Sequence, residues 1–381
     1  MSNINSWRKE FVTETLILFL SIKGRINFLQ LGRFGIFKEQ RYRQQFEKTF
    51  DFLTFNKEFT LMHGSGRYAI AFDPSYIRKS GKSTPGVRYF WSGCSGSAKW
   101  GLEIGGLAAI DIDNHTAFHL EAVQTMASGG QSLADWYGDI ISQRKAQLLD
   151  ISPYLVADAW FAKHSFVEQV SKAGMHLICR LRDDADLRYL HQGGHTGKRG
   201  RPKKYDGKVN NSDINMNYFS LVLQDEDATV STAIVYSKSL KRDIRVVHVR
   251  YATGKHKLYF STDTDMEALD ILKFYQSRFQ IEFLYRDGKQ HTGLNDCQAR
   301  SGNKLDFHFN ASLTAINLAK AVHWLNVPKQ ARKAFSMADI KTINHNALQL
   351  NLFFDKFGIN PYSPKNIKRA RELLYYGTIA A

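Results

Sequence analysis

The sequence has few cysteines and no long apolar segment. Its three cysteines, Cys94, Cys179 and Cys297, are odd in number, lie far apart and form no Cys-x-x-Cys pair. They favour reduced cytoplasmic thiols over a disulfide framework or a zinc site. The most apolar segment, residues 15–22, is about eight residues long, whereas a helix needs roughly 20 residues to span a bilayer. It also lacks a small-residue cleavage site, so we expect neither a membrane span nor a signal peptide.

Acidic residues are also in deficit. The chain has 381 residues with 52 Lys or Arg against 36 Asp or Glu, a formal net charge of +16. Such a surplus makes polyanions the expected partners. Nucleic acid is favoured over an anionic membrane because no segment could insert. The hydrophobic content of 43% argues against disorder, and the length allows one large domain or two to three smaller ones.

One segment combines charge with an apolar setting. Residues 266–290 are predicted to form a single helix, and at about 100° per residue Tyr275, Arg278, Glu282 and Lys289 share one narrow stripe. Charge on a helix usually marks a solvated face. Here aromatic and aliphatic residues border the stripe on both sides, so we expect it to face inward, with Ser277 and Asp287 among the residues on the opposite arc.

The spacing Tyr275-x2-Arg278-x3-Glu282-x6-Lys289 resembles the Y-R-E-K signature of bacterial cut-and-paste transposases. This is the insertion-sequence group named for insertion sequence four, within the DDE superfamily. Four residues at three set spacings are far more specific than one acidic residue. The resemblance implies two further aspartates upstream, each at the end of a strand.

Two apolar runs lead into aspartates. Residues 68–72 read as a strand that ends at Asp73, because Pro74 cannot continue a ladder. Residues 154–157 lead into Asp158 in the same manner. An aspartate at a strand end is often a turn former, and other aspartates near strand ends are Asp111, Asp113, Asp183 and Asp184. Position alone therefore leaves the choice open, and the order of motifs in the resembling family selects Asp73 and Asp158.

The order of strands and helices predicts an α/β core. The resemblance implies that this core is ribonuclease-H-like, with a β-rich insertion and helical N- and C-terminal regions. Four strands of the insertion are expected at residues 218–224, 230–237, 245–251 and 257–261. The expected regions are a helical DNA-binding region (1–62), the first part of the catalytic core (63–182), a basic loop with the β-rich insertion (183–263), the core helix with the signature (264–300) and a basic helical C-terminal region (301–381).

The resemblance also assigns the chemistry. Asp73, Asp158 and Glu282 would hold two Mg²⁺ ions, for which Mn²⁺ can substitute. Hard cations prefer carboxylate oxygens, and a metal pair suits phosphodiester transfer because it serves both the attacking and the leaving oxygen. Phosphate contacts beside the cut are implied at Tyr275, Arg278 and Lys289, since a DNA backbone is held by cations and hydroxyl donors.

Two other segments are candidate DNA contacts. Residues 198–204 read Lys-Arg-Gly-Arg-Pro-Lys-Lys and resemble an AT-hook, which enters the narrow minor groove. A flexible phosphate-binding loop is the alternative, and the candidate contacts are Arg199, Arg201, Lys203 and Lys204. The basic, aromatic region 1–62 could likewise be a helical cap with a solvated face, and the resemblance favours DNA binding.

The sequence therefore predicts a DNA transposase. It would cleave at the terminal inverted repeats of an insertion sequence and join the 3′-hydroxyl ends to target DNA, as a nucleoid-associated cytoplasmic homodimer on paired ends. The alternatives are an inactive or repurposed DNA-binding protein and a non-transposing nuclease of the same fold. One departure concerns the hairpin step, in which the family stacks a flipped base on an insertion aromatic, commonly tryptophan. The insertion here has no tryptophan, and the substitutes would be Tyr251, Tyr259 or Phe260.

Overall fold

The computed structural model describes residues 4–127, 129–193 and 202–379. The helices are α1 (Ser6–Ser21), α2 (Phe28–Phe34), α3 (Glu39–Gln45), α4 (Phe52–His63), α5 (Leu133–Leu149), α6 (His164–Lys172), α7 (Ala268–Ser277), α8 (Gln280–His291), α9 (Gly302–Lys320), α10 (Met337–Phe357) and α11 (Pro364–Leu374). Short 3₁₀ or π segments are η1 (Gly93–Ser95), η2 (Ala159–Phe161), η3 (Ala321–Leu325) and η4 (Lys329–Ala331). The strands are β1 (Tyr68–Arg78), β2 (Arg88–Ser92), β3 (Ser97–Asp111), β4 (Thr116–Gln124), β5 (Tyr154–Val156), β6 (His176–Arg180), β7 (Leu187–Leu190), β8 (Tyr205–Lys208), β9 (Ser220–Gln224), β10 (Ala228–Ser237), β11 (Arg242–Tyr251) and β12 (His256–Ser261).

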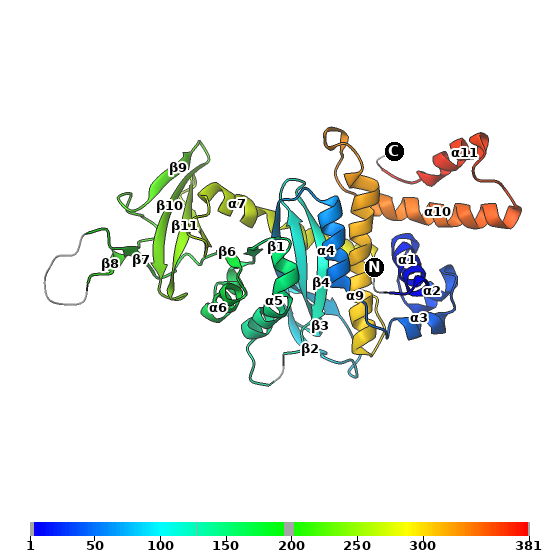
Figure 1. Ribbon diagram of the computed structural model, residues 1–381, viewed down its shortest axis with the longest axis horizontal. Coiled ribbons are helices and arrows are strands. Elements are labelled where there is room, and N and C mark those ends of the chain that lie inside the picture. The colour runs from blue at the N-terminus through cyan, green and yellow to red at the C-terminus, as the bar shows by residue number, and fades with distance from the viewer. Residues whose placement is uncertain (1–3, 128, 194–201, 380–381) are drawn as a thin grey trace.

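The strands form one mixed sheet, which confirms the α/β class (Figure 1). Its order is β2-β3-β1-β5-β6-β12-β11-β10-β7-β8, with β4 added beside β3 and β9 beside β10. β5 runs parallel to both β1 and β6, whereas β12 is antiparallel to β6. The four predicted insertion strands are present as β9 to β12. They continue the core sheet, because Phe260 on β12 pairs with Cys179 on β6.

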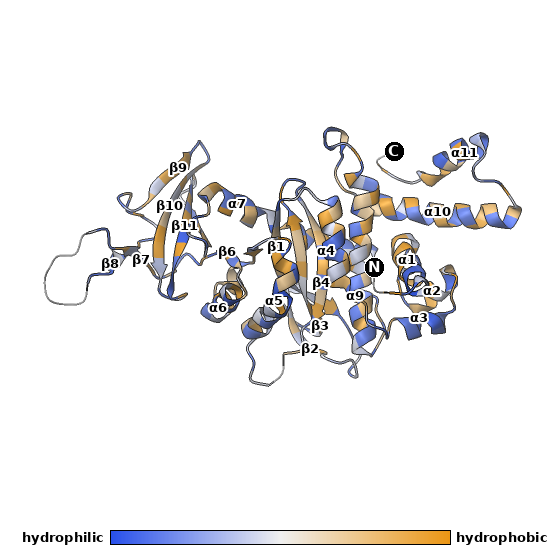
Figure 2. Ribbon diagram, viewed as in Figure 1, coloured by the Kyte–Doolittle hydropathy of each residue, from blue (hydrophilic) through white to orange (hydrophobic). Residues whose placement is uncertain are grey.

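Helices cover both faces of the central sheet, as the alternation along β1 shows. Ala69 and Ala71 pack in the same apolar cluster as residues of α7, α8 and α9. Ile70 and Phe72 point the other way and join a second cluster with residues of α5 and α6. A central strand buried on both faces reads as a continuous apolar run, and apolar residues do concentrate along the strands (Figure 2).

The predicted end of the first strand at Asp73-Pro74 is wrong. β1 continues to Arg78 and pairs with β3 through Pro74, whose partner is Gly105. The reason lies on the other side of the strand, where β5 pairs with β1 only at Ile70 and Ala71. Beyond these residues β1 has a strand partner on one side, and a proline is tolerated where its missing N–H would face the unpaired side.

Helix α9 seals the outer edge of β4 with polar side chains. The Asn310 side chain accepts from the amide of Ala122 at 2.8 Å and donates to its carbonyl at 3.0 Å. Asn317 makes the same pair of contacts with His119, both at 2.8 Å. An unpaired edge strand buried under a helix would leave its backbone unsatisfied, and the two asparagines remove that cost.

The C-terminal region is helical, as expected. α9 runs into η3, and α10 then extends away from the central sheet with α11 folded back beside it (Figure 1). Among the residues that the structure describes, no helix combines the length and apolar character that crossing a membrane requires.

Candidate active site

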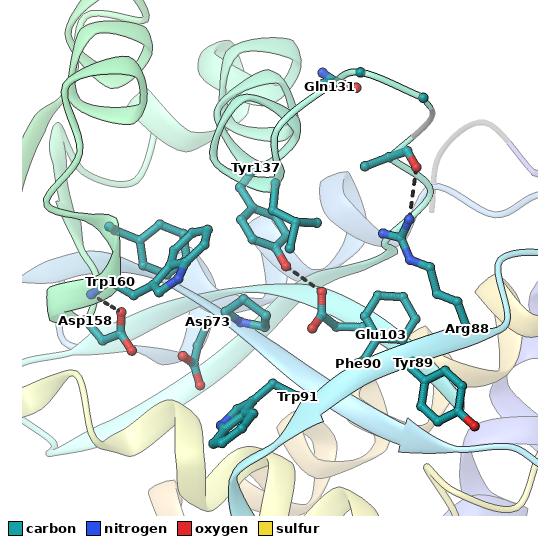
Figure 3. Close-up of a pocket in the computed structure, with 16 residues that line it drawn as sticks. Asp73, Arg88, Tyr89, Phe90, Trp91, Glu103, Gln131, Tyr137, Asp158 and Trp160 are labelled. Carbon is teal, nitrogen blue, oxygen red and sulfur yellow. Dashed lines mark hydrogen bonds between the residues drawn. The ribbon is translucent and has the colours of Figure 1, made fainter. Parts of the chain in front are cut away.

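Two of the predicted aspartates lie together at the point where β5 ends. Ala71 of β1 pairs with Val156 of β5 in parallel, so Asp73 and Asp158 each follow two residues beyond that pair. Asp158 comes directly before η2, and its Oδ1 accepts the amide of Trp160 at 2.9 Å. Both aspartates line one cavity of about 960 Å³ (Figure 3).

The electrostatic setting of Asp73 is unusual for a carboxyl group. Its pKa is raised to about 7, chiefly by burial, and the nearby negative charges of Asp158 and Glu282 act in the same direction. Arg278 and Lys289 act in the opposite direction. Converging carboxyl groups repel one another when ionised, and bound cations reverse that balance.

The predicted single helix over residues 266–290 is two helices, α7 and α8. The joint is tightened: the amide of Arg278 bonds to the carbonyl of Tyr275 at 3.1 Å, and that of Glu282 to the carbonyl of Phe279 at 3.0 Å. These are three-residue steps of the 3₁₀ kind. Just ahead of the joint, Ser277 Oγ donates to the carbonyl of Lys273 at 2.7 Å, a back-bond that often bends helices.

The break changes which residues face the core. Ser277 and Asp287, expected on the outer arc, are both buried. Asp287 accepts from the guanidinium of Arg286, with 2.9 Å between Nη2 and Oδ1. Asp287 lies beyond the joint, where counting a constant 100° per residue gives the wrong direction, because a 3₁₀ step turns the chain further than an α step.

Arg278 lies between two of the predicted metal ligands. Its Nη2 donates to Glu282 Oε1 at 2.9 Å, and its Nη1 lies 3.9 Å from Asp73 Oδ1. The side chain is only 14% exposed. The structure thus brings Arg278, Glu282 and Asp73 together, with the Glu282 carboxylate turned towards the guanidinium.

The other two residues of the signature contact strands of the sheet. Lys289 Nζ donates to Ser75 Oγ at 2.9 Å, two residues beyond Asp73 on β1. The Tyr275 ring packs against that of Tyr259 on β12, with centroids 4.9 Å apart. Burial raises the pKa of Tyr275, so its hydroxyl stays protonated and able to donate.

Two residues that support the site were missed by sequence reasoning. Tyr285 on α8 donates its hydroxyl to the carbonyl of Asp73 at 2.5 Å. Gly106 on β3, the partner of Asp73, leaves room for this hydroxyl, because a Cβ there would lie 1.9 Å from Tyr285 Oη. The Gly105-Gly106 pair inside an apolar strand was the available signal, since glycine in a strand often marks a close approach.

The carboxylates fit hard divalent cations in their chemistry. Asp73 and Asp158 line one cavity and offer the oxygen donors that such ions prefer. In the described part of the chain, however, no three His, Cys, Asp or Glu side chains come close enough to form a metal cluster. In this conformation the Glu282 carboxylate accepts a hydrogen bond from Arg278.

Of the four predicted basic contacts, the structure describes Lys203 and Lys204. Arg199 and Arg201 lie outside the described residues. Lys203 Nζ forms an ion pair with Asp206 Oδ1 at 2.8 Å, and His191 Nδ1 lies 2.6 Å from the same oxygen. This carboxylate offsets part of the positive charge on that side of the loop.

The insertion aromatics differ in their availability to a base. Tyr259 and Phe260 are buried in the sheet, so neither presents a face for stacking. Tyr251 is partly exposed, with Lys257 Nζ 5.6 Å from its ring centroid. The suggested substitution by Tyr259 or Phe260 is therefore wrong for this conformation, because both side chains serve the packing between β12 and its neighbours.

Comparison with known proteins gives one family. Residues 140–318 match the family model described as transposase DDE domain. The match supports a transposase of the DDE superfamily. The matched range includes Asp158, Glu282 and the helices α7 and α8, whereas Asp73 precedes it. No curated protein matches the chain.

Proposed function

We propose that this protein is a DNA transposase with a ribonuclease-H-like core, of the group that carries the Y-R-E-K signature. The observation that carries the proposal is the parallel pairing of β1 with β5, which aligns Asp73 and Asp158 at one cavity. Arg278 and Glu282 stand at the same place, at the joint between α7 and α8. The transposase DDE domain match supports the same reading.

Asp73, Asp158 and Glu282 would hold two Mg²⁺ ions. Such ions activate the attacking oxygen and stabilise the leaving oxygen of a phosphodiester. The protein supplies position: β1 and η2 fix the two aspartates, and Arg278 holds the Glu282 carboxylate by a hydrogen bond. The planar Arg278 guanidinium would also be able to donate to a phosphate oxygen of the DNA.

The surrounding donors would place the DNA backbone. Tyr275 lies on α7 and Lys289 on α8, on either side of the joint that carries Arg278. Backbone contacts of this kind fix register without reading bases. The DNA would be the terminal inverted repeats of the element, held in a pair by two copies of the chain, and then the target duplex.

A cleavage and joining assay tests the proposal. The substrate is a duplex that carries the inverted repeat flanking the gene, incubated with Mg²⁺ and a target plasmid. Asp73→Asn, Asp158→Asn and Glu282→Gln are each expected to lower the cutting rate at least roughly 100-fold, because even the residues that hydrogen-bond to a metal's ligands are worth roughly 10- to 100-fold. Asp184→Asn is the matched control, since that side chain is 72% exposed and pairs with Arg182.

The outcomes separate the alternatives. A transposase cuts at the repeat and joins the 3′ ends to the plasmid. Cutting without joining would identify a nuclease of the same fold. Tight binding to the repeat without nicking in Mg²⁺ or Mn²⁺ would identify a DNA-binding protein. Cleavage at the wild-type rate by all three carboxylate variants would overturn the site assignment.

A further inference from the structure

A row of equivalent positions crosses the three central parallel strands. The two parallel pairings align one residue from each strand: Ala71 on β1, Val156 on β5 and Ile178 on β6. Two residues further along the chain, these strands lead to Asp73, Asp158 and Arg180. Neighbouring strands lie about 4.8 Å apart. The arginine therefore occupies the place next to the second aspartate.

Arg180 projects from the face of the sheet that carries α7 and α8. Side chains alternate between the two faces along a strand. Ile178 belongs to the apolar cluster that contains residues of α7 and α8, whereas Cys179 belongs to the cluster on the opposite face. Burial raises the pKa of Tyr275 on α7, and the positive charges of Arg278 and Arg180 act in the opposite direction. Both cations therefore lie near the Tyr275 hydroxyl.

The protein itself satisfies the guanidinium of Arg180 poorly. The side chain is 34% exposed, and its Nη2 lies 3.4 Å from Oδ1 of Asp183, whose side chain is 56% exposed. A hydrogen bond of this length is weak. The Nε atom is buried and has no hydrogen-bond acceptor among the described residues. A partly buried cation with an unpaired donor is expensive, so an anionic ligand is its natural partner.

With Arg180, the donors beside the carboxylates form a row across the strands. Lys289 and Arg278 contact residues of β1. Tyr275 packs against Tyr259 on β12, whose strand partner on β6 is Arg180. The row thus runs from β1 to β6, the direction in which the sheet continues into the insertion (Figure 1). A DNA strand carries one phosphate per nucleotide, so successive phosphates of one strand fit a row of donors.

We propose that Arg180 binds a phosphate of the cleaved strand on the β6 side of the cut, while Lys289 binds one on the β1 side. This inference rests on the proposed function, since it requires DNA at the two aspartates. The guanidinium can donate two parallel hydrogen bonds to one phosphate. The cleaved strand then crosses the sheet from β1 towards the insertion, and its position is fixed without any contact to a base.

Duplexes that carry one neutral phosphate test the inference. The probes contain the inverted repeat with a single methylphosphonate, which removes the charge of one backbone phosphate, at each position near the cut in turn. Affinities are measured by fluorescence anisotropy in EDTA, which prevents cleavage. In wild type, neutralising the phosphate bound by Arg180 should weaken binding roughly 10- to 100-fold, the range for a hydrogen bond between charged groups. In Arg180→Met the same probe should bind like the unmodified duplex, because the partner of that phosphate is already absent.

Two further variants separate a phosphate contact from a structural role. Arg180→Lys keeps the charge but loses the planar fork, so the effect of the same methylphosphonate should be smaller than in wild type but still present. Arg188→Met is the matched control, since that side chain is 35% exposed and lies 3.4 Å from Asp186, but on β7, outside the three parallel strands. It should keep the wild-type profile. A structural role of Arg180 would instead weaken the binding of every probe by the same factor.

The outcomes are distinguishable. If wild type binds the repeat and Arg180→Met shows the same sensitive phosphates, the inference is wrong and the proposed DNA function stands. If wild type binds no duplex that carries the repeat, both fail. If Lys289→Met and Arg180→Met lose sensitivity at the same phosphate, the path across the strands is wrong. Should Arg180→Met not fold, Arg180→Lys decides, because a wild-type profile in that variant would contradict the inference.

Discussion

The close approach of Tyr285 to β3 gives a sharp test of how the catalytic strand is held. Gly106→Ala would place a Cβ 1.9 Å from Tyr285 Oη and 2.8 Å from Cζ. The tyrosine is buried and its hydroxyl donates to the carbonyl of Asp73. The ring must therefore move, and the hydrogen bond must lengthen or break.

The cost can be estimated from these contacts. Overpacking of a buried site costs about 1–3 kcal/mol, and loss of one hydrogen bond adds about 0.5–1.5 kcal/mol. We expect Gly106→Ala to lower the free energy of unfolding by about 2–4 kcal/mol. Tyr285→Phe alone should cost about 1 kcal/mol. In the double variant the missing hydroxyl removes the closest clash. Its loss of stability should therefore be smaller than the sum of the losses in the two single variants.

The measurement is chemical unfolding of the four proteins, with DNA cleavage as a second readout. Cleavage should fall in Gly106→Ala because the backbone of Asp73 shifts with Tyr285. Gly302→Ala serves as the control, since this glycine is the first residue of α9 and a Cβ there meets no atom within 4 Å. Equal stability of wild type and Gly106→Ala, or strictly additive costs in the double variant, would refute this account of Gly106.

Two further predictions concern charge. Burial raises the pKa of Asp73 from 3.8 to about 7, so its contribution to stability is fully present below pH 3.8 and is lost as the pH rises through 7. In EDTA, Asp73→Asn should therefore unfold at a higher temperature than wild type at pH 8, and the difference should vanish near pH 4; calorimetry showing a constant difference would contradict this. Lys289→Met should reduce the slope of log affinity for DNA against log salt by about one, and an unchanged slope would exclude a phosphate contact by Lys289.

Much of the sheet could be predicted from the sequence because strand pattern is a local property. The runs ahead of Asp73 and Asp158 are apolar and contain β-branched and aromatic residues, and they form neighbouring strands of one sheet. The four strands of the insertion were found for the same reason. The inward direction of Arg278 also followed from its apolar flanks.

What could not be predicted depends on partners distant in sequence. Pro74 is tolerated inside β1 because β5 stops short of it, which no local pattern reveals. The joint between α7 and α8 involves a back-bond from Ser277, and the sequence does not show whether a helical serine makes such a bond or points to solvent. Glu103 lies in an apolar strand, and its burial is tolerated because the hydroxyl groups of Tyr137 and Thr125 donate to its carboxylate.

The asparagine contacts between α9 and β4 have a consequence for protein synthesis. The partners His119 and Asn317 are 198 residues apart in the chain, so β4 leaves the ribosome long before the helix that closes its edge. Contacts of such sequence separation slow folding, and until α9 arrives the nascent chain displays an open, apolar edge strand of the kind that aggregates. Premature stop codons ahead of α9 should thus yield insoluble fragments, and a cell that carries a truncated copy gains a burden on its chaperones in place of a working enzyme.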